Sequence, residues 1–263
     1  MKRKALVLLF ILILVLAIPL RAGSKNFSPK KTKVIVSLEA PLKVLTVGER
    51  LVFDVSWMGV PVGVGTLEVR EIVTIDGRRA YHVVAIAKTN DFLSRLYPIH
   101  DEVHSFIDAE KFYSLEFSKV IQEGRYRADE KMIYDYKKGK IFYESLWNKS
   151  KKEFELFSEV QDFLSAFYWF RVQPVVVGKS LHTVVNSEAE NWDLELNVLR
   201  HEIKEFRDGR VLQTILVEPK TRLKGMLYQR DRVWVYFSAD QKRLPVWVTL
   251  RTPFGPVSGV LRP

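Results

Sequence analysis

The sequence contains no cysteine. This absence excludes disulfides, cysteine nucleophiles, thiolate metal sites and redox pairs, and also a lipid anchor on a cysteine behind a leader. Catalytic motifs are missing as well: there is no glycine-rich phosphate loop, and the segment Gly255 to Gly259 does not have the Gly-x-Ser-x-Gly spacing of a serine hydrolase. We therefore expect no catalytic residue and no cofactor, and predict a non-enzymatic protein.

Acidic residues are missing from the beginning of the chain, where the first is Glu39. Eight of the 41 Lys and Arg precede it, so the remaining 33 face 31 Asp and Glu, and the net charge of +10 falls to +2. A nearly neutral domain lacks the positive field of a phosphate binder. We therefore expect no nucleic-acid partner.

The amino-terminal segment has the charge order of a secretory leader. A basic start precedes an apolar run from Ala5 to Leu20, whose length lies between that of a signal peptide and that of a membrane-spanning helix. We expect residues 1–22 to be a signal peptide, or an uncleaved anchor that associates with the membrane through residues 5–20. Residues 23–41 read as a basic tether. The protein is then exported and either periplasmic or anchored to the inner membrane.

The rest of the chain alternates apolar and polar residues with a period of two. Leu51, Phe53, Val55 and Trp57 show this pattern, and Asp76-Gly77 is typical of a hairpin turn. Similar runs and turns recur to the end of the chain. We predict a single β-rich domain over residues 42–263, with a mainly all-β fold: a strongly curved antiparallel sheet, or open β-barrel, of about a dozen strands.

One segment has a helical period instead. Ser158 to Gln161 has the spacing of a capping box, and it precedes the aromatic run from Asp162 to Arg171. Because this run is apolar on nearly every side, we predict one buried aromatic helix across the sheet.

Five ordered blocks resemble an exported bacterial family. They are Gly48 to Trp57 with Gly59 and Gly63; Tyr97, Asp101 and Asp108; Glu123 to Arg127; Asp162 to Arg171; and Asp240 with Arg243 to Val246. The chain is similar over nearly all of residues 47–261 to the family called domain of unknown function 3108. The resemblance implies a Gram-negative-type envelope location and a single β domain, and it implies no activity.

The polar residues around His100 suggest two kinds of site, a metal site and a hydrolase active site. His100 and His104 would lie roughly 13 Å apart on a strand at about 3.3 Å per residue, too far to share a zinc ion, so we expect no metal site. Asp101, Glu102 and Asp108 could supply a carboxylate pair for glycoside hydrolysis, although no spacing selects one. An unrecognised hydrolase built on Asp101, Glu102 or His104 therefore stays an alternative.

Aromatic residues suggest a binding site. An apolar cavity between curved strands and the helix would bind a lipophilic ligand, although the same side chains could simply fill the core. Our candidate ligand-binding residues are Trp57, Phe163, Phe167, Trp169, Phe170 and Trp192, with Trp234 and Trp247 as further candidates. The leading hypothesis is an envelope protein that binds a lipophilic small molecule or an envelope protein, and the alternative is a structural or adaptor module of a membrane assembly.

Overall fold

The structure, a computed structural model, describes residues 45–156, 158–187, 190–223, 226–228 and 232–263, and the side chains of 223–231 are not described. The predicted leader and tether lie outside the described residues. Among these residues, no helix has the length and apolarity needed to cross a membrane.

Strands dominate the described chain, as the alternating pattern predicts. The strands are β1 (Arg50–Trp57), β2 (Val60–Ile75), β3 (Arg78–Thr89), β4 (His100–Asp108), β5 (Ser114–Glu123), β6 (Tyr126–Asp135), β7 (Lys140–Ser145), β8 (Ser150–Glu155), β9 (Ser180–Ser187), β10 (Glu190–Glu205), β11 (Val211–Leu223), β12 (Met226–Tyr228), β13 (Arg232–Ser238), β14 (Pro245–Thr252) and β15 (Gly255–Leu261). The helices are α1 (Asp91–Ser94) and α2 (Phe163–Val172).

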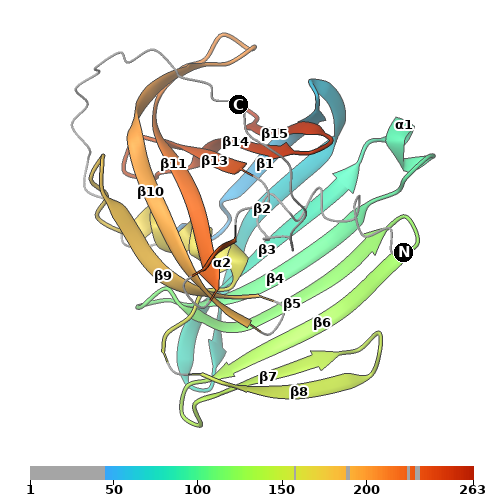
Figure 1. The fold of residues 1–263 in the computed structure, drawn as a ribbon, viewed down its shortest axis with the longest axis vertical. Coiled ribbons are helices and arrows are strands. Elements are labelled where there is room, and N and C mark those ends of the chain that lie inside the picture. Colours follow the sequence, from blue (N-terminus) through green and yellow to red (C-terminus); the bar gives the residue numbers. More distant parts are fainter. Residues whose placement is uncertain (1–44, 157, 188–189, 224–225, 229–231) are drawn as a thin grey trace.

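All fifteen strands belong to one antiparallel sheet. Its order is β8-β7-β6-β5-β4-β3-β2-β1-β15-β14-β13-β11-β10-β9, with β12 paired to β11. The first and last strands of the domain meet at its centre, where Phe53 is opposite Leu261. The sheet curves around α2 without closing (Figure 1). The predicted class, a mainly β fold with a curved, open sheet, is confirmed.

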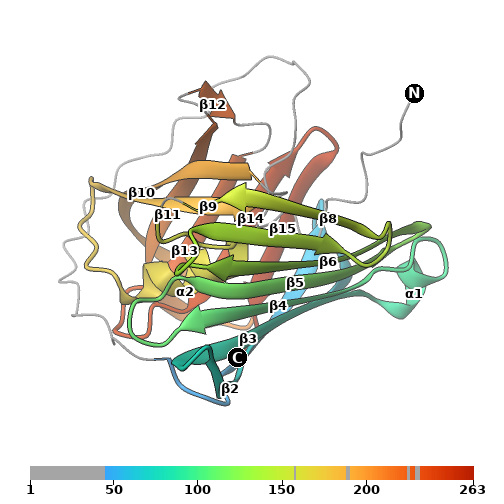
Figure 2. The same ribbon diagram turned by 90° about the horizontal axis from the view of Figure 1, so that it is seen from below.

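Helix α2 lies on the concave side of the sheet, where two core clusters meet (Figures 1 and 2). Leu164 and Tyr168 pack with residues of β3 to β7 such as Phe117. Ala166 and Phe170 pack with residues of β9 to β14. The helix is thus buried on both sides, which explains why its sequence is apolar around nearly the whole circumference.

The helix begins later than the capping-box pattern predicts. Asp162, not Ser158, is the N-cap, and its side chain accepts from the backbone N–H groups of Leu164 and Ser165. Ser158 is exposed, while Val160 and Gln161 are buried, and Gln161 forms an isolated bridge to Val185 of β9. The Ser158 prediction was wrong because the backbone of Gln161 bonds to β9 instead of entering the helix.

Two short elements lacked a sequence signal. Strand β8 has the sequence SKKEFE, in which only Phe154 is apolar, and it forms one edge of the sheet. Exposed Lys151 and Lys152 on this edge hinder pairing with another chain. Helix α1 is a single turn capped by the Asn90 side chain, which accepts from Leu93 N at 2.9 Å.

Candidate ligand cavity under helix α2

A partly open cavity of about 90 Å³ lies between α2 and the centre of the sheet. Its walls come from strands β1 to β4, β14 and β15 and from α2. The lining residues are Phe53, Val55, Gly65, Thr66, Leu67, Ala85, Ile86, Ala87, Asp101, Val103, Phe163, Phe167, Pro245, Val248 and Gly259. Nearly all are apolar, so the cavity suits an apolar occupant.

Small residues on neighbouring strands create this space. Gly65 of β2 and Gly259 of β15 lie on either side of β1, beneath the Phe53 side chain. A Cβ atom added at Gly65 would lie 3.9 Å from Phe53 Cβ, which is ordinary contact. Since neither glycine has a positive φ, the backbone does not require glycine there. A larger side chain at Gly65 would fit and would reduce the cavity.

The amino-terminal end of α2 is fixed to β4 and β5 through the buried Asp162. The hydroxyl groups of Ser105 and Ser114 each donate to Asp162 Oδ2 at 2.6 Å, while its Oδ1 accepts two backbone N–H groups of the helix. Burial raises the pKa of Asp162, and these donated hydrogen bonds act in the opposite direction. Every position around this carboxyl group is therefore occupied.

The carboxyl-terminal end of α2 is fixed by Arg171. Its guanidinium group donates to both carboxylate oxygens of Glu49, at 2.6 and 2.8 Å, and to the backbone oxygen of Lys242 at 3.0 Å. Nearby, Arg243 donates to the backbone oxygen of Gln173. These contacts join three of the blocks that carry the family resemblance, and they hold the helix that forms one wall of the cavity.

The acidic residue of the cavity wall, Asp101, belongs to a pair of buried carboxyl groups. Asp101 of β4 and Glu123 of β5 are both 1% exposed and interact with each other, and Gln122 N donates to Asp101 Oδ1 at 2.9 Å. Burial raises the pKa of both groups, and the adjacent Asp101 raises that of Glu123 further, to about 9. Two adjacent buried carboxyl groups favour holding one proton between them, because ionising both would place like charges side by side. Among the residues that the structure describes, none forms a hydrogen bond with Asp101 Oδ2.

Tyr97 covers this pair from the turn that follows α1. Burial, followed by the nearby Glu123 and Asp101, raises the pKa of its hydroxyl group. Its ring lies against Gly124, whose φ is +53°, and a Cβ atom there would come within 2.6 Å of Tyr97 Cε2. The glycine is thus needed both for the turn and for the close approach of the ring.

Two of the six predicted ligand-binding residues line the cavity, namely Phe163 and Phe167. Phe170 points to the other core cluster, where its ring centroid is 4.3 Å from that of Phe237. Trp169 is partly buried between the two clusters. Trp192 is half-buried on β10. Trp57 is the last residue of β1 and is exposed. The structure thus brings together only part of the predicted set.

The two further tryptophans lie on strand faces that point away from α2. Trp234 is next to Val235, and Trp247 is next to Val248, and both valines belong to the cluster that packs on the helix. The Arg232 guanidinium group lies 4.9 Å from the Trp234 ring, and Lys204 Nζ lies 4.9 Å from the Trp247 ring. Both rings therefore pack beneath cations on the convex face.

The residues of the hydrolase hypothesis are separated. Asp101 faces the cavity, whereas Glu102 is on the opposite face of β4 and contacts His104 at 3.1 Å. His104 contacts His82 at 2.9 Å, and His82 contacts Glu71 at 3.4 Å. Burial lowers the pKa of His104. Within the described part of the chain, no group of three or more side chains could hold a metal ion.

Asp108 lies at the far end of β4 from Asp101. Its Oδ1 accepts from the backbone N–H groups of Glu110 and Lys111 at 3.0 and 2.9 Å, so it stabilises the turn to β5. The actual partner of Asp101, Glu123, was not among our site predictions. Its signal in the sequence was the Glu123-Gly124 turn of the family resemblance, but only the strand register shows that this turn lies beside Asp101.

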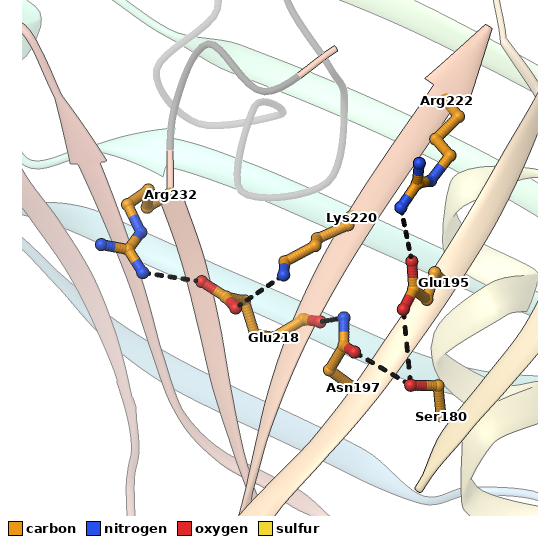
Figure 3. Close-up of polar contacts among 7 residues, drawn as sticks. All are labelled: Ser180, Glu195, Asn197, Glu218, Lys220, Arg222 and Arg232. Carbon is orange, nitrogen blue, oxygen red and sulfur yellow. Dashed lines mark hydrogen bonds and ion pairs between the residues drawn. The ribbon is translucent and has the colours of Figure 1, made fainter. Parts of the chain in front are cut away.

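A second polar cluster lies on the convex face and does not reach the cavity (Figure 3). Its residues are Ser180, Glu195, Asn197, Glu218, Lys220, Arg222 and Arg232. Glu218, although nearly buried, has Arg232 at 3.1 Å and Lys220 at 3.6 Å. Ser180 donates to Asn197 at 2.9 Å across β9 and β10. This arrangement joins β9, β10, β11 and β13, and each acid has a basic partner, so we assign it to sheet stability.

Comparison with known proteins identifies the family. The sequence profile described as "Protein of unknown function (DUF3108)" matches residues 52–262. The chain belongs to this family. No curated protein matches the DUF3108 chain described here.

Among solved structures, this DUF3108 protein is similar to one described as a β-barrel-like protein of domain of unknown function DUF1849 from Brucella abortus. The two share 10% sequence identity with a TM-score of 0.50, over 81% of this chain and 94% of the other. At this identity the similarity concerns the fold alone.

Proposed function

We propose that this DUF3108 protein is a non-enzymatic protein of the cell envelope that binds a lipophilic ligand under α2. The observation that carries the proposal is the apolar cavity of about 90 Å³. Packed interiors have few voids larger than a water molecule. Here glycine and alanine residues on adjacent strands leave such a void beside a helix fixed at both ends.

The size of the cavity indicates how much of a ligand it holds. An apolar cavity of roughly 150 Å³ is enough for benzene, so this one would take a short chain or branch. Because the cavity is partly open, the remainder of a longer ligand can extend from it. The ligand class is therefore an apolar chain, of which a terminal part is buried.

The carboxyl pair adds a chemical preference. Asp101 lines the cavity, its Oδ2 has no hydrogen-bond partner among the described residues, and a buried acceptor without a donor is costly. A hydroxyl or ammonium group on the ligand would supply that donor. A carboxylate ligand would instead be repelled, so we propose an apolar alcohol or amine rather than a fatty-acid anion.

The proposed location follows from the leader. Its basic start and apolar run from Ala5 to Leu20 support export to the periplasm, or anchoring to the inner membrane through residues 5–20. The mass of the protein isolated from its host distinguishes the two cases. A mass that lacks residues 1–22 supports cleavage, and the full mass supports an anchor.

Binding of 11-(dansylamino)undecan-1-ol, an apolar chain with a terminal hydroxyl group and a dye that fluoresces in apolar surroundings, tests the proposal with the full chain. We expect saturable binding that Gly65→Val weakens at least tenfold, because the valine occupies the cavity. The control is Thr74→Val, which adds a valine at an exposed position of the same strand and should bind as the original protein does. Equal binding by both variants would disprove the cavity as the site.

Competition against the same probe tests the chemical preference. Decan-1-ol should displace it at a concentration at least tenfold below that of decanoate. Equal displacement would reject the role of Asp101 while leaving cavity binding intact. The adaptor alternative is supported if no apolar compound binds and crosslinking in envelopes instead recovers a stoichiometric protein partner. Turnover of a glycoside that is lost in Asp101→Asn would support the hydrolase alternative.

A further inference from the structure

Five turns of the chain lie side by side at one end of the sheet. Trp57 Nε1 donates to Phe254 O at 3.1 Å, which joins the β1–β2 and β14–β15 turns. Asn90 beside α1 donates to Pro61 O at 2.8 Å, and Gly124 N donates to Pro98 O at 2.8 Å. Leu146 N donates to Asp129 O at 2.8 Å, so the β7–β8 turn lies next to the start of β6. Figure 2 shows α1 and the β7–β8 turn at this same end.

These turns carry large apolar side chains that face solvent. Phe92 is 75% exposed, Trp147 65% and Trp57 40%. Met58 and Phe254 are exposed beside Trp57. Among the side chains that the structure describes, these five include every exposed tryptophan, phenylalanine and methionine. We call the five residues the apolar rim.

The turns at the opposite end have a different composition. Their exposed tips include Asp76-Gly77 between β2 and β3, Lys137-Lys138 between β6 and β7, Asp208-Gly209 between β10 and β11, and Gln241-Lys242 between β13 and β14. In an antiparallel sheet successive turns alternate between the two ends. The difference in composition among these turns therefore follows the two ends of the sheet.

We propose that the apolar rim docks onto the surface of a lipid bilayer with anionic headgroups. Tryptophan and phenylalanine favour the boundary between headgroups and acyl chains. The same turns and strand ends expose four basic residues and the acidic Asp91. The basic residues are Arg95, Arg125, Lys149 and Arg251. Basic residues around an apolar surface attract it to anionic lipids.

The shape of the rim favours a bilayer over a protein partner. Its side chains stand on separate turn tips, whereas protein interfaces centre on a continuous, fully buried patch. Separate tips can each enter the headgroup region without a complementary surface. This docking goes beyond ligand binding and does not depend on it, although Val55 of the cavity wall is only two residues from Trp57.

Single cysteines placed in the cysteine-free full chain test the proposal. Phe92→Cys and Trp147→Cys report on the rim, and Lys138→Cys and Gln241→Cys report on the opposite end. Each is labelled with an environment-sensitive nitrobenzoxadiazole dye and mixed with vesicles of phosphatidylglycerol and phosphatidylethanolamine. We expect a blue shift and a severalfold rise in fluorescence for the rim labels only. The leader is present in all four proteins, so binding through the leader alone would give no difference between the two ends.

Charge reversal tests the role of the headgroups. Arg95→Glu with Lys149→Glu should abolish the response of a label at Phe254→Cys, while Arg79→Glu with Arg207→Glu at the opposite end should preserve it. Circular dichroism checks that each variant is folded. The proposal is overturned if rim labels do not respond, if both ends respond equally, or if the rim response appears without vesicles as protein concentration rises, which would indicate self-association.

Discussion

The concave interior contains two regions that are built differently. Around the ends of α2, Asp162 and Arg171 have hydrogen-bond partners for their charged groups. Beside the helix, the cavity wall includes small residues such as Gly65 and Ala85, and the adjacent carboxyl groups of Asp101 and Glu123 have few hydrogen-bond partners. The first region holds the fold together, and the second has space and an unused acceptor.

This difference separates stability from binding. Removing one partner of a buried ion pair destabilises the protein, because the other charge is left buried and uncompensated. Substitutions in a cavity, or at a buried carboxyl group beside it, can instead stabilise the protein. Mutations in the two regions should therefore change the free energy of unfolding in opposite directions, which the following predictions test.

The largest loss is expected for Arg171→Met. It leaves the Glu49 carboxylate, whose side chain is only 14% exposed, without its bidentate partner. We expect the free energy of unfolding to fall by about 3–5 kcal/mol, measured by urea denaturation. Adding Glu49→Gln should recover part of the loss. If the double variant is as unstable as the sum of the single variants, the two residues are not coupled and the interpretation fails.

Asp162→Ala comes next. It removes the N-cap of α2 and leaves the hydroxyl groups of Ser105 and Ser114 without their acceptor, for an expected loss of about 2–4 kcal/mol. The matched control is Ser158→Ala, which changes the residue that the sequence pattern favoured as the cap but that is exposed. Thermal unfolding should show almost no effect of Ser158→Ala. A comparable loss from both would contradict the observed cap.

These two variants show what the sequence could and could not predict. The alternating pattern identifies the strands and the turns, because burial on one face imposes a period of two. It also identifies α2, because a run of ten largely apolar residues must be buried. The cap was mistaken because Ser158 and Asp162 are both good N-cap residues, and only the bridge between Gln161 and Val185 decides where the helix begins.

The candidate site was harder to predict than the fold. Phe163 and Phe167 were predicted to line a cavity and do so, because they share a face of the helix. Phe170 points in another direction and packs in the second core cluster. Glu123 was missed because its contact with Asp101 depends on how β4 pairs with β5, and pairing across 21 intervening residues leaves no local pattern. Cavities formed by Gly65, Ala85 and Gly259 likewise depend on long-range register.

Glu123→Gln should stabilise the protein in a pH-dependent way. Its native pKa is raised to about 9 from 4.5, so the native state keeps a proton that the unfolded chain releases. The stability due to this group is complete below pH 4.5 and is lost as the pH rises towards 9. Glutamine can donate to Asp101 without binding a proton. We expect a gain of about 1–3 kcal/mol at pH 8 and almost none at pH 4.5.

Urea denaturation at the two pH values measures this effect. The control is Glu153→Gln, at an exposed position of β8, for which we expect no comparable gain at either pH. A Glu123→Gln gain that is equal at pH 4.5 and pH 8 would show that proton uptake is not its cause. A loss at pH 8 would show that Glu123 is ionised in the native protein.

The smallest effect is expected when the cavity is filled from β3. Ala85 lines the cavity, whereas Ala80 on the same strand is 0% exposed in a packed cluster with Tyr113 and Leu115. Ala85→Leu should change the free energy of unfolding by no more than about 0.5 kcal/mol, because buried apolar area compensates for local adjustment. Ala80→Leu should lower it by about 1–3 kcal/mol, because that site has no space. Equal losses in urea denaturation would mean that the interior beside α2 is packed as tightly as the rest of the core, and the contrast between the two regions would disappear.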